Sequence, residues 1–168
     1  GTGLLVSDGK YHIEPLMQGG TGSSSMNLEQ PDFMPDGLES GTVNTVGIIA
    51  LKNGLDFVSF MGTEKIFRHE NRLCRRFIDG LYGTDVIIYR RPGVGYVPIV
   101  SFNLPGMKPE DAAGLLNQRG FCLRAGLHCS PLAHHSLGTP DGTVRFAPSV
   151  FNNEQQVENL VKTIKKLQ

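Results

Sequence analysis

The sequence predicts an α+β fold in which a short, mostly antiparallel sheet is covered by helices on one face. From residue 85 onward, short segments rich in Val, Ile and Phe alternate with longer segments whose apolar residues recur at helical spacing. Two of the strand segments follow one another before the first intervening helix, an order typical of α+β layers. The 168 residues suffice to bury one core, or at most two small ones.

We expect the chain to have two parts. Residues 1–60 have the pattern of glycine-rich and threonine-bearing loops followed by a linking helix, and residues 61–168 that of a small α+β domain. A turn signal at residues 7–10 predicts a hairpin that pairs residues 3–7 with residues 11–16.

The first part is expected to end in a long loop and a helix. Clustered glycines and prolines between residues 19 and 41 predict irregular chain, and loops of that length in a compact domain are usually functional or disordered. Asn44 or Thr45 can cap a helix that runs to about Phe60. The apolar residues of this helix recur on one face, at Ile48, Leu51, Leu55 and Val58.

The second part carries the predicted strands. After a helix at residues 63–82, we expect strands at 85–89 and 97–102, a helix at 109–120, a strand at 121–124, a short helix at 131–137, a strand at 143–146 and a final helix. Pro98 suggests that the second strand lies at an edge of the sheet. Asn152 or Asn153, with a glutamine three residues further on, predicts a capping box at the start of the final helix.

Composition excludes several classes of protein. The 16 basic and 16 acidic residues balance without forming a long run of one sign, so no nucleic-acid partner is expected. No apolar stretch approaches the ~18 residues that suggest a membrane span, and the first residues lack the basic region of a signal peptide. Three irregularly spaced cysteines, Cys74, Cys122 and Cys129, indicate neither a disulfide framework nor a metal site and favour a cytoplasmic location. Of these, Cys74 and Cys122 are expected to pack in the core.

The sharpest chemical feature is Cys129, which follows a predicted strand in a loop loosened by Gly126. His128 stands beside it and Arg124 five residues before it. Positive neighbours favour the thiolate, which is the reactive form of a cysteine. Two alternatives stay open at this point. One is an inert thiol packed as a small hydrophobe, and the other is a Cys–His hydrolase, although neighbouring strand residues point to opposite faces.

Arg145 is a second candidate, because it lies within a predicted apolar strand. Arginine is rarely buried without a partner, and a guanidinium that projects from a strand can bind a carboxylate at two points. An internal salt bridge or a water-facing arginine would explain the same residue.

Glycine and hydroxyl residues precede the first predicted helix in two segments, 19–23 and 39–44. Gly41 and Thr42 stand immediately before the helix, where backbone N–H groups and the helix dipole can bind an anion. Neither segment matches the phosphate-binding loop GxxxxGK[ST], so ordinary loop and capping chemistry explains them when they are taken alone.

Taken in order, these segments resemble the cysteine desulfurase branch of the class V aminotransferase family. The resemblance extends over essentially the whole chain and is carried by residues 19–23, 39–45, 124–129, 142–146 and 151–154. It implies a fold-type I transferase that uses pyridoxal phosphate. Residues 61–168 would be its small carboxyl-terminal domain, and residues 1–60 a remnant of its large domain.

The resemblance also implies roles for individual residues. Cys129 takes the place of the catalytic cysteine, which receives sulfur from L-cysteine as a persulfide while alanine is released. Arg145 takes the place of the residue that binds the substrate carboxylate, and Arg124 would assist it or order the cysteine loop. Thr42 and Gly41 would contact the cofactor phosphate of the other subunit in a homodimer. The expected supporting residues are Asn44, Glu39 and His128.

One departure from the family matters for activity. A family member holds pyridoxal phosphate on a lysine shortly before the segment that matches residues 1–3, and no lysine of this chain takes that place. We therefore expect the cofactor in the full-length protein and expect the chain alone to be inactive. The alternatives are a non-catalytic dimerisation or partner-binding module, a selenocysteine lyase, and another enzyme of the class V aminotransferase type. For a desulfurase we also expect a sulfur-acceptor protein as a partner.

Overall fold

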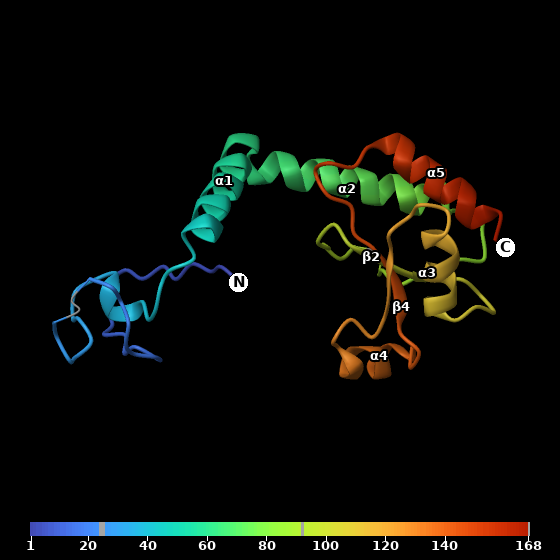
Figure 1. Cartoon of the computed structure of the whole chain (residues 1–168). Helices are drawn as coiled ribbons and strands as arrows, with labels where there is room; N and C mark the ends of the chain where they lie inside the picture. Colours follow the sequence, from blue (N-terminus) through green and yellow to red (C-terminus); the bar gives the residue numbers. More distant parts are fainter. Residues whose placement is uncertain (24–25, 92, 168) are drawn as a thin grey trace. The chain divides into compact units, whose positions relative to one another are not determined.

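The structure is a computed structural model that describes residues 1–23, 26–91 and 93–167. It consists of two compact units, Gly1–Phe60 and Met61–Gln168, and Figure 1 labels several of their helices and strands. The predicted loop between residues 19 and 41 includes residues 24 and 25, which lie outside the described residues.

In the described part of the first unit, regular structure is limited to one short and one long helix. The short 3-10 helix η1 (Asp36–Leu38) precedes the helix α1 (Thr45–Met61). Gln30 ties the irregular segments of this unit together. Its amide nitrogen donates to the carbonyl oxygen of Asp36 at 2.9 Å, and its side-chain oxygen accepts the N–H of Gly19 at 2.9 Å.

The predicted hairpin in the first unit is wrong. The chain from residue 3 to residue 16 forms no strand, and Leu4, Leu5 and Val6 are exposed. An isolated two-stranded hairpin is marginal in water without an apolar face packed on other elements, and here these side chains stay in solvent. The helix predicted from Asn44 or Thr45 is confirmed as α1, but none of its residues is buried.

The second unit is an α+β domain, as predicted. In chain order its elements are α2 (Thr63–Gly80), β1 (Ile87–Ile88), β2 (Val100–Asn103), α3 (Pro109–Asn117), β3 (Arg124–Gly126), α4 (Pro131–Leu137), β4 (Thr143–Phe146) and α5 (Glu154–Lys165). The strands form one antiparallel sheet in the order β1-β2-β4-β3. The edge position suggested by Pro98 is wrong, because β2 pairs with a strand on both sides and Pro98 lies before it.

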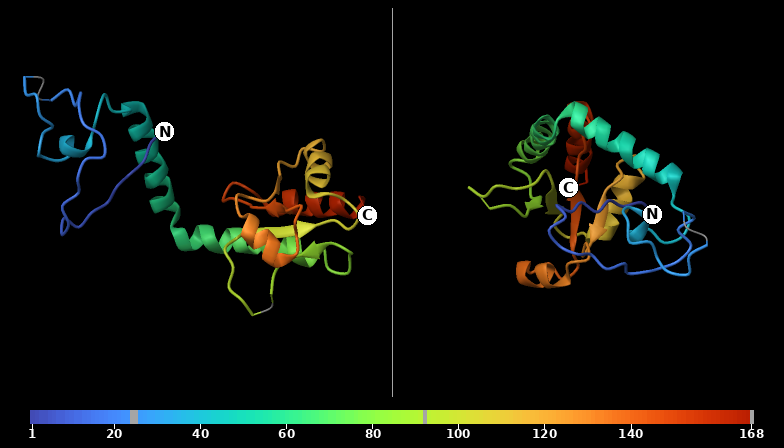
Figure 2. Two further views of the ribbon diagram at one scale, coloured as in Figure 1. Left: turned by 90° about the horizontal axis from the view of Figure 1, so that it is seen from below. Right: turned by 90° about the vertical axis from the view of Figure 1, so that its left-hand side faces the viewer.

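The core lies between the sheet and the helices α2, α3 and α5 (Figures 1 and 2). Strand residues alternate, so Val100 and Phe102 of β2 and the corresponding residues of β4 point into it. Phe77 of α2 sits at its centre, with its ring stacked on Phe146 at a centroid distance of 4.4 Å and tilted against Phe102 at 5.2 Å. The opposite face of the sheet is therefore free to carry polar side chains.

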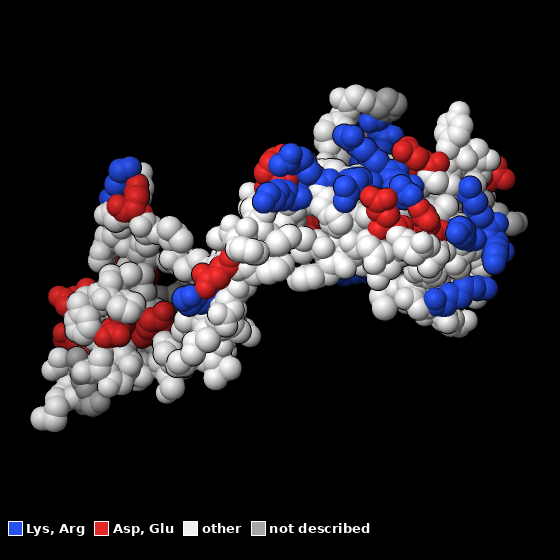
Figure 3. Space-filling model, turned by 90° about the horizontal axis from the view of Figure 1, so that it is seen from above, with Lys and Arg blue, Asp and Glu red and all other residues white. Residues whose placement is uncertain are grey.

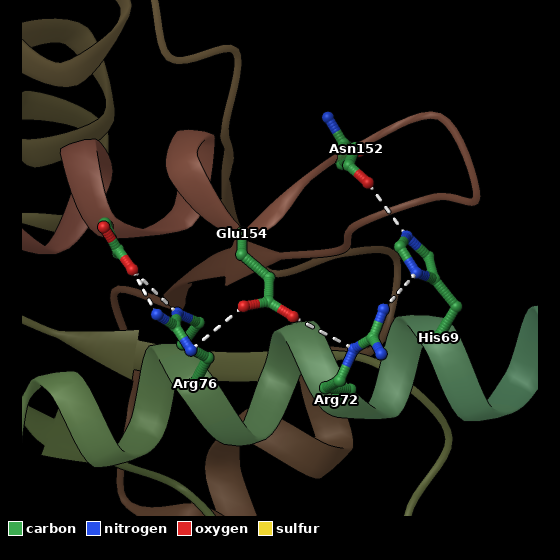
Figure 4. A network of polar contacts seen from close by, with 6 residues as sticks. His69, Arg72, Arg76, Asn152 and Glu154 are labelled. Carbon is green, nitrogen blue, oxygen red and sulfur yellow. Dashed lines mark hydrogen bonds and ion pairs between the residues drawn. The ribbon is translucent and has the colours of Figure 1, made fainter.

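A polar network joins α2 to the start of α5 (Figure 4). Glu154 accepts from Arg72 at 3.2 Å and from Arg76 at 3.0 Å, and His69 contacts the carbonyl oxygen of Asn152 at 2.8 Å. Figure 3 shows that Lys and Arg side chains gather over these two helices, with acidic side chains among them. Each such exposed pair contributes only about 0.2–1 kcal/mol, so the apolar core determines how these helices pack.

The capping box predicted for the final helix is confirmed at Asn153. Its side-chain oxygen accepts the N–H of Gln156 at 3.0 Å, while the side chain of Gln156 accepts the N–H of Asn153 at 3.0 Å.

The strand predicted at residues 121–124 is displaced, because β3 begins only at Arg124. Asn117 at the end of α3 accepts the N–H of Leu123 at 3.2 Å, which holds this backbone away from a ladder. As a result Cys122 is exposed, and its predicted place in the core is wrong.

Candidate active site

Cys129 lies in the short connection between β3 and α4, and it is exposed. The alternative of a buried, inert thiol is therefore wrong for this residue. His128 and Cys129 both have left-handed backbone conformations, with φ of 51° and 61°. Each such residue costs about 1–3 kcal/mol, and such conformations persist only where the surrounding structure enforces them.

The imidazole of His128 fastens this connection to strand β4. Its Nε2 lies 3.0 Å from the carbonyl oxygen of Thr143, the first residue of β4. A carbonyl oxygen only accepts, so Nε2 carries the hydrogen. The other nitrogen, Nδ1, is buried without a hydrogen-bond partner among the described residues. Because neither ring nitrogen bonds to the sulfur of Cys129, the Cys–His hydrolase alternative has no geometric support.

Burial is the largest cause that lowers the pKa of His128 below its usual value, and the charges of Arg145, His134 and Arg124 act in the same direction. The hydrogen bond to Thr143 acts in the opposite direction, but the net shift is downward. The ring is therefore neutral at neutral pH.

Arg145 and Arg124 lie directly opposite each other on adjacent strands. The ladder between β3 and β4 pairs Arg124 with Arg145, and the ladder on the other side pairs Arg145 with Ser101. Directly paired residues point to the same face of a sheet. Since Val144 and Phe146 are buried in the core, Arg145 points to the face away from α2, α3 and α5, together with its two partners.

The two guanidinium groups favour an anionic ligand. Like charges that face each other across a ladder are destabilising, and neither arginine forms a salt bridge to any described residue. A carboxylate bound between them would relieve this repulsion, and arginine binds carboxylates at two points.

Close backbone packing connects the arginine strand to the cysteine loop. Gly142, with φ of 86°, lies so near β3 that a Cβ at this position would stand 2.3 Å from the carbonyl carbon of Gly126. Asn103 at the end of β2 secures the same corner: its amide nitrogen donates to the carbonyl oxygen of Gly142 at 3.1 Å, and its oxygen accepts the N–H of Val144 at 3.3 Å. We did not predict Asn103 as a site residue; a polar residue that ends an apolar strand was the available signal.

The remaining predicted site residues lie in the first unit. Gly41, with φ of 76°, donates its N–H to the carbonyl oxygen of Gly19 at 2.9 Å. Thr42 is exposed just before α1, and Asn44 caps that helix by accepting the N–H of Gly47 at 3.0 Å. Glu39 ends η1, where its N–H reaches the carbonyl oxygen of Asp36 at 3.2 Å. The second unit thus assembles the cysteine and both arginines, and the first unit assembles residues 39–44, the threonine loop.

The remaining cysteine, Cys74, differs from Cys129 in its exposure to solvent. Cys74 is buried on α2, as predicted, and burial raises the pKa of its thiol to about 11. It therefore stays protonated. Among the residues that the structure describes, no group of three or more His, Cys, Asp or Glu is placed to hold a metal ion, and none of the described helices is long and apolar enough to cross a membrane.

The sequence profile of the family described as aminotransferase class-V matches residues 1–160. The chain belongs to this family. Among its relatives, a probable cysteine desulfurase of Halobacterium salinarum is 32% identical over 97% of this chain and 41% of its own length, and a cysteine desulfurase of Haloferax volcanii is 31% identical over 97% and 40%. The solved apo structure of a cysteine desulfurase from Thermococcus onnurineus NA1 matches 79% of this chain and 33% of its own, with 33% identity and a TM-score of 0.75.

These relatives place the chain near the cysteine desulfurases of the class V aminotransferase family. The chain spans only about two fifths of the length of the curated relatives, as the shares of 41% and 40% show. Enzymes of this family generally use pyridoxal phosphate.

Proposed function

We propose that the chain is part of a cysteine desulfurase that moves sulfur from L-cysteine to Cys129. The observation that carries this proposal is the arrangement in the second unit. An exposed cysteine is held in a left-handed turn, directly after a strand whose Arg124 faces Arg145. A nucleophile in the loop that follows β3, beside two arginines on the sheet, would suit a reaction that positions an amino acid next to a thiolate.

In this proposal Arg145 binds the carboxylate of L-cysteine, and Arg124 adds a second positive group. Both project from paired strands, which fixes their positions better than a loop would. The negative charge of the substrate carboxylate would pair with the two guanidinium groups, which have no ion-pair partner among the described residues.

The thiolate of Cys129 then receives the substrate sulfur. A sulfur–sulfur bond forms as the Cβ–S bond of the substrate breaks, and the electron pair of that bond stays with the carbon, which takes a proton and leaves as alanine. Cys129 is left as a persulfide, and a sulfur acceptor outside this chain takes the sulfur onward. Pyridoxal phosphate, when bound, supplies the electron sink that makes the carbon–sulfur bond labile.

Two features of the loop around Thr42 support a contact with the phosphate of this cofactor. Thr42 presents an exposed hydroxyl just before the amino terminus of α1, a helix end that favours anions. A Cβ at Gly41 would meet no atom within 4 Å, so the loop is open to a ligand. We propose that Thr42 and Gly41 serve the cofactor of the other subunit in a homodimer, with Asn44 and Glu39 shaping the loop, and that the enzyme acts in the cytoplasm.

The full-length protein loaded with pyridoxal phosphate tests the proposal. Sulfide release from L-cysteine with a thiol reductant should disappear in Cys129→Ala and persist in Cys122→Ala, which removes another exposed cysteine. Full activity of Cys129→Ala would refute the role of this residue. Turnover of L-selenocysteine but not of L-cysteine would favour a selenocysteine lyase, and no turnover of either would favour a binding module.

A further inference from the structure

We propose that His128 is a positioning residue for Cys129: its imidazole fixes the cysteine loop to the backbone of the strand that carries Arg145. This inference deepens the proposed function and rests on it.

The contacts of His128 explain how a side chain could set the place of its neighbour. Nε2 donates to the carbonyl oxygen of Thr143 at 3.0 Å, and Thr143 stands two residues before Arg145 on β4. On another side, the ring lies 5.9 Å from that of His134, a buried residue of α4 that contacts the hydroxyl of Thr139 at 2.9 Å. His128 therefore links the loop to β4 and lies beside His134, the buried residue of α4.

The backbone of the loop needs such a link. Left-handed conformations at His128 and Cys129, with φ of 51° and 61°, are unfavourable for residues with a side chain. Within the loop, the N–H of Ser130 donates to the carbonyl oxygen of Leu127 at 2.9 Å, a local bond that closes the turn without fixing it to the sheet. Without the imidazole, the two residues would relax towards ordinary φ values, and the sulfur would move relative to Arg145.

The link also depends on the protonation state of the ring. A second proton would have to enter at Nδ1, which is buried without an acceptor among the described residues. The groups that face the ring from β4, β3 and α4 are Arg145, Arg124 and His134, and each of them opposes an added positive charge. Acidification therefore weakens the fit of His128 between the sheet and α4.

Two variants of the full-length, cofactor-loaded enzyme test this role. His128→Ala removes the donor, whereas His128→Gln keeps an N–H donor at similar reach and cannot be protonated. His135→Ala, an exposed histidine of α4, is the matched control. Because misplacement of a reacting group by about 1 Å can cost about a hundredfold, we expect His128→Ala to lower kcat for L-cysteine by tenfold or more, with KM changed less than threefold.

His128→Gln should recover most of that loss at neutral pH and should lack the wild-type decline in kcat on the acidic side. Wild-type kcat in His128→Ala, or a His128→Gln variant as impaired as His128→Ala, would overturn the proposal. Hydrogen exchange of residues 127–130, measured by mass spectrometry, gives a readout that does not depend on turnover. Exchange should be faster in His128→Ala only, and unchanged exchange would also overturn the proposal. Failure of the proposed function itself would appear separately, as activity retained in Cys129→Ala.

Discussion

Replacing Gly142 by alanine should displace the corner that joins the arginine strand to the cysteine loop. The φ of 86° is unfavourable for alanine, at a cost of about 1–2 kcal/mol. The new Cβ would also stand 2.3 Å from the carbonyl carbon and 2.4 Å from the carbonyl oxygen of Gly126. Both are backbone atoms, so the strands must separate, and overpacking of this kind costs about 1–3 kcal/mol. The two terms together predict a loss of about 2–5 kcal/mol.

Gly106→Ala provides the matched control for this prediction. Gly106 has a similar φ of 73°, but a Cβ there would meet no atom within 4 Å. This variant pays the conformational cost alone, so the difference between the two free energies of unfolding isolates the clash. Urea unfolding followed by circular dichroism should place Gly142→Ala about 1–3 kcal/mol below Gly106→Ala, and sulfide release should fall only in Gly142→Ala. Equal stability and equal activity of the two variants would refute the reasoning.

Three further predictions concern the binding of the substrate carboxylate by Arg145, the apolar core, and the pH dependence of stability. Arg145→Lys keeps the charge but loses two-point binding, so kcat/KM for L-cysteine should fall about tenfold or more. A kcat/KM equal to that of Ser101→Ala would contradict two-point binding of the carboxylate by Arg145. Phe77→Ala removes the ring between Phe102 and Phe146 and should cost about 3–5 kcal/mol of unfolding free energy, whereas Tyr82→Ala, at a position that is 91% exposed, should change it by less than about 0.5 kcal/mol. In the folded state the pKa of His128 is lowered from its ordinary value of 6.5. The stability that the neutral His128 ring contributes is therefore fully present above pH 6.5 and is lost as the pH falls below 6.5. The stability difference between wild type and His128→Gln, measured from pH 7.5 to pH 5.5, should therefore shift against the wild type, and a constant difference would contradict a neutral ring with a buried Nδ1.

The elements that carry their own local signals were predictable from the sequence. The capping pair Asn153 and Gln156 marks the start of α5, and the apolar alternation of β4 places Arg145 on the open face of the sheet. The candidate residues Cys129 and Arg145 were likewise proposed from their local surroundings and from the order of the motifs.

Features that depend on distant partners were not predictable. The strand β3 begins later than the apolar pattern predicts, because the N–H of Leu123 bonds to the side chain of Asn117 in place of a neighbouring strand, and Cys122 is exposed. The hairpin expected at the start of the chain fails because its apolar side chains find no packed surface in their unit. The contact of His128 with Thr143 and the role of Asn103 join residues 15 and 41 positions apart in the chain, and no local pattern encodes such pairs.

The most direct test is to locate the transferred sulfur on the protein. The full-length enzyme with pyridoxal phosphate is mixed with L-cysteine for less than one turnover, alkylated and digested, and each cysteine peptide is weighed by mass spectrometry. The proposed function predicts the mass of one additional sulfur atom on the peptide that contains Cys129, and none on those with Cys74 or Cys122. Alanine formed while the added sulfur lies on Cys122, or on no cysteine of the protein, would contradict it.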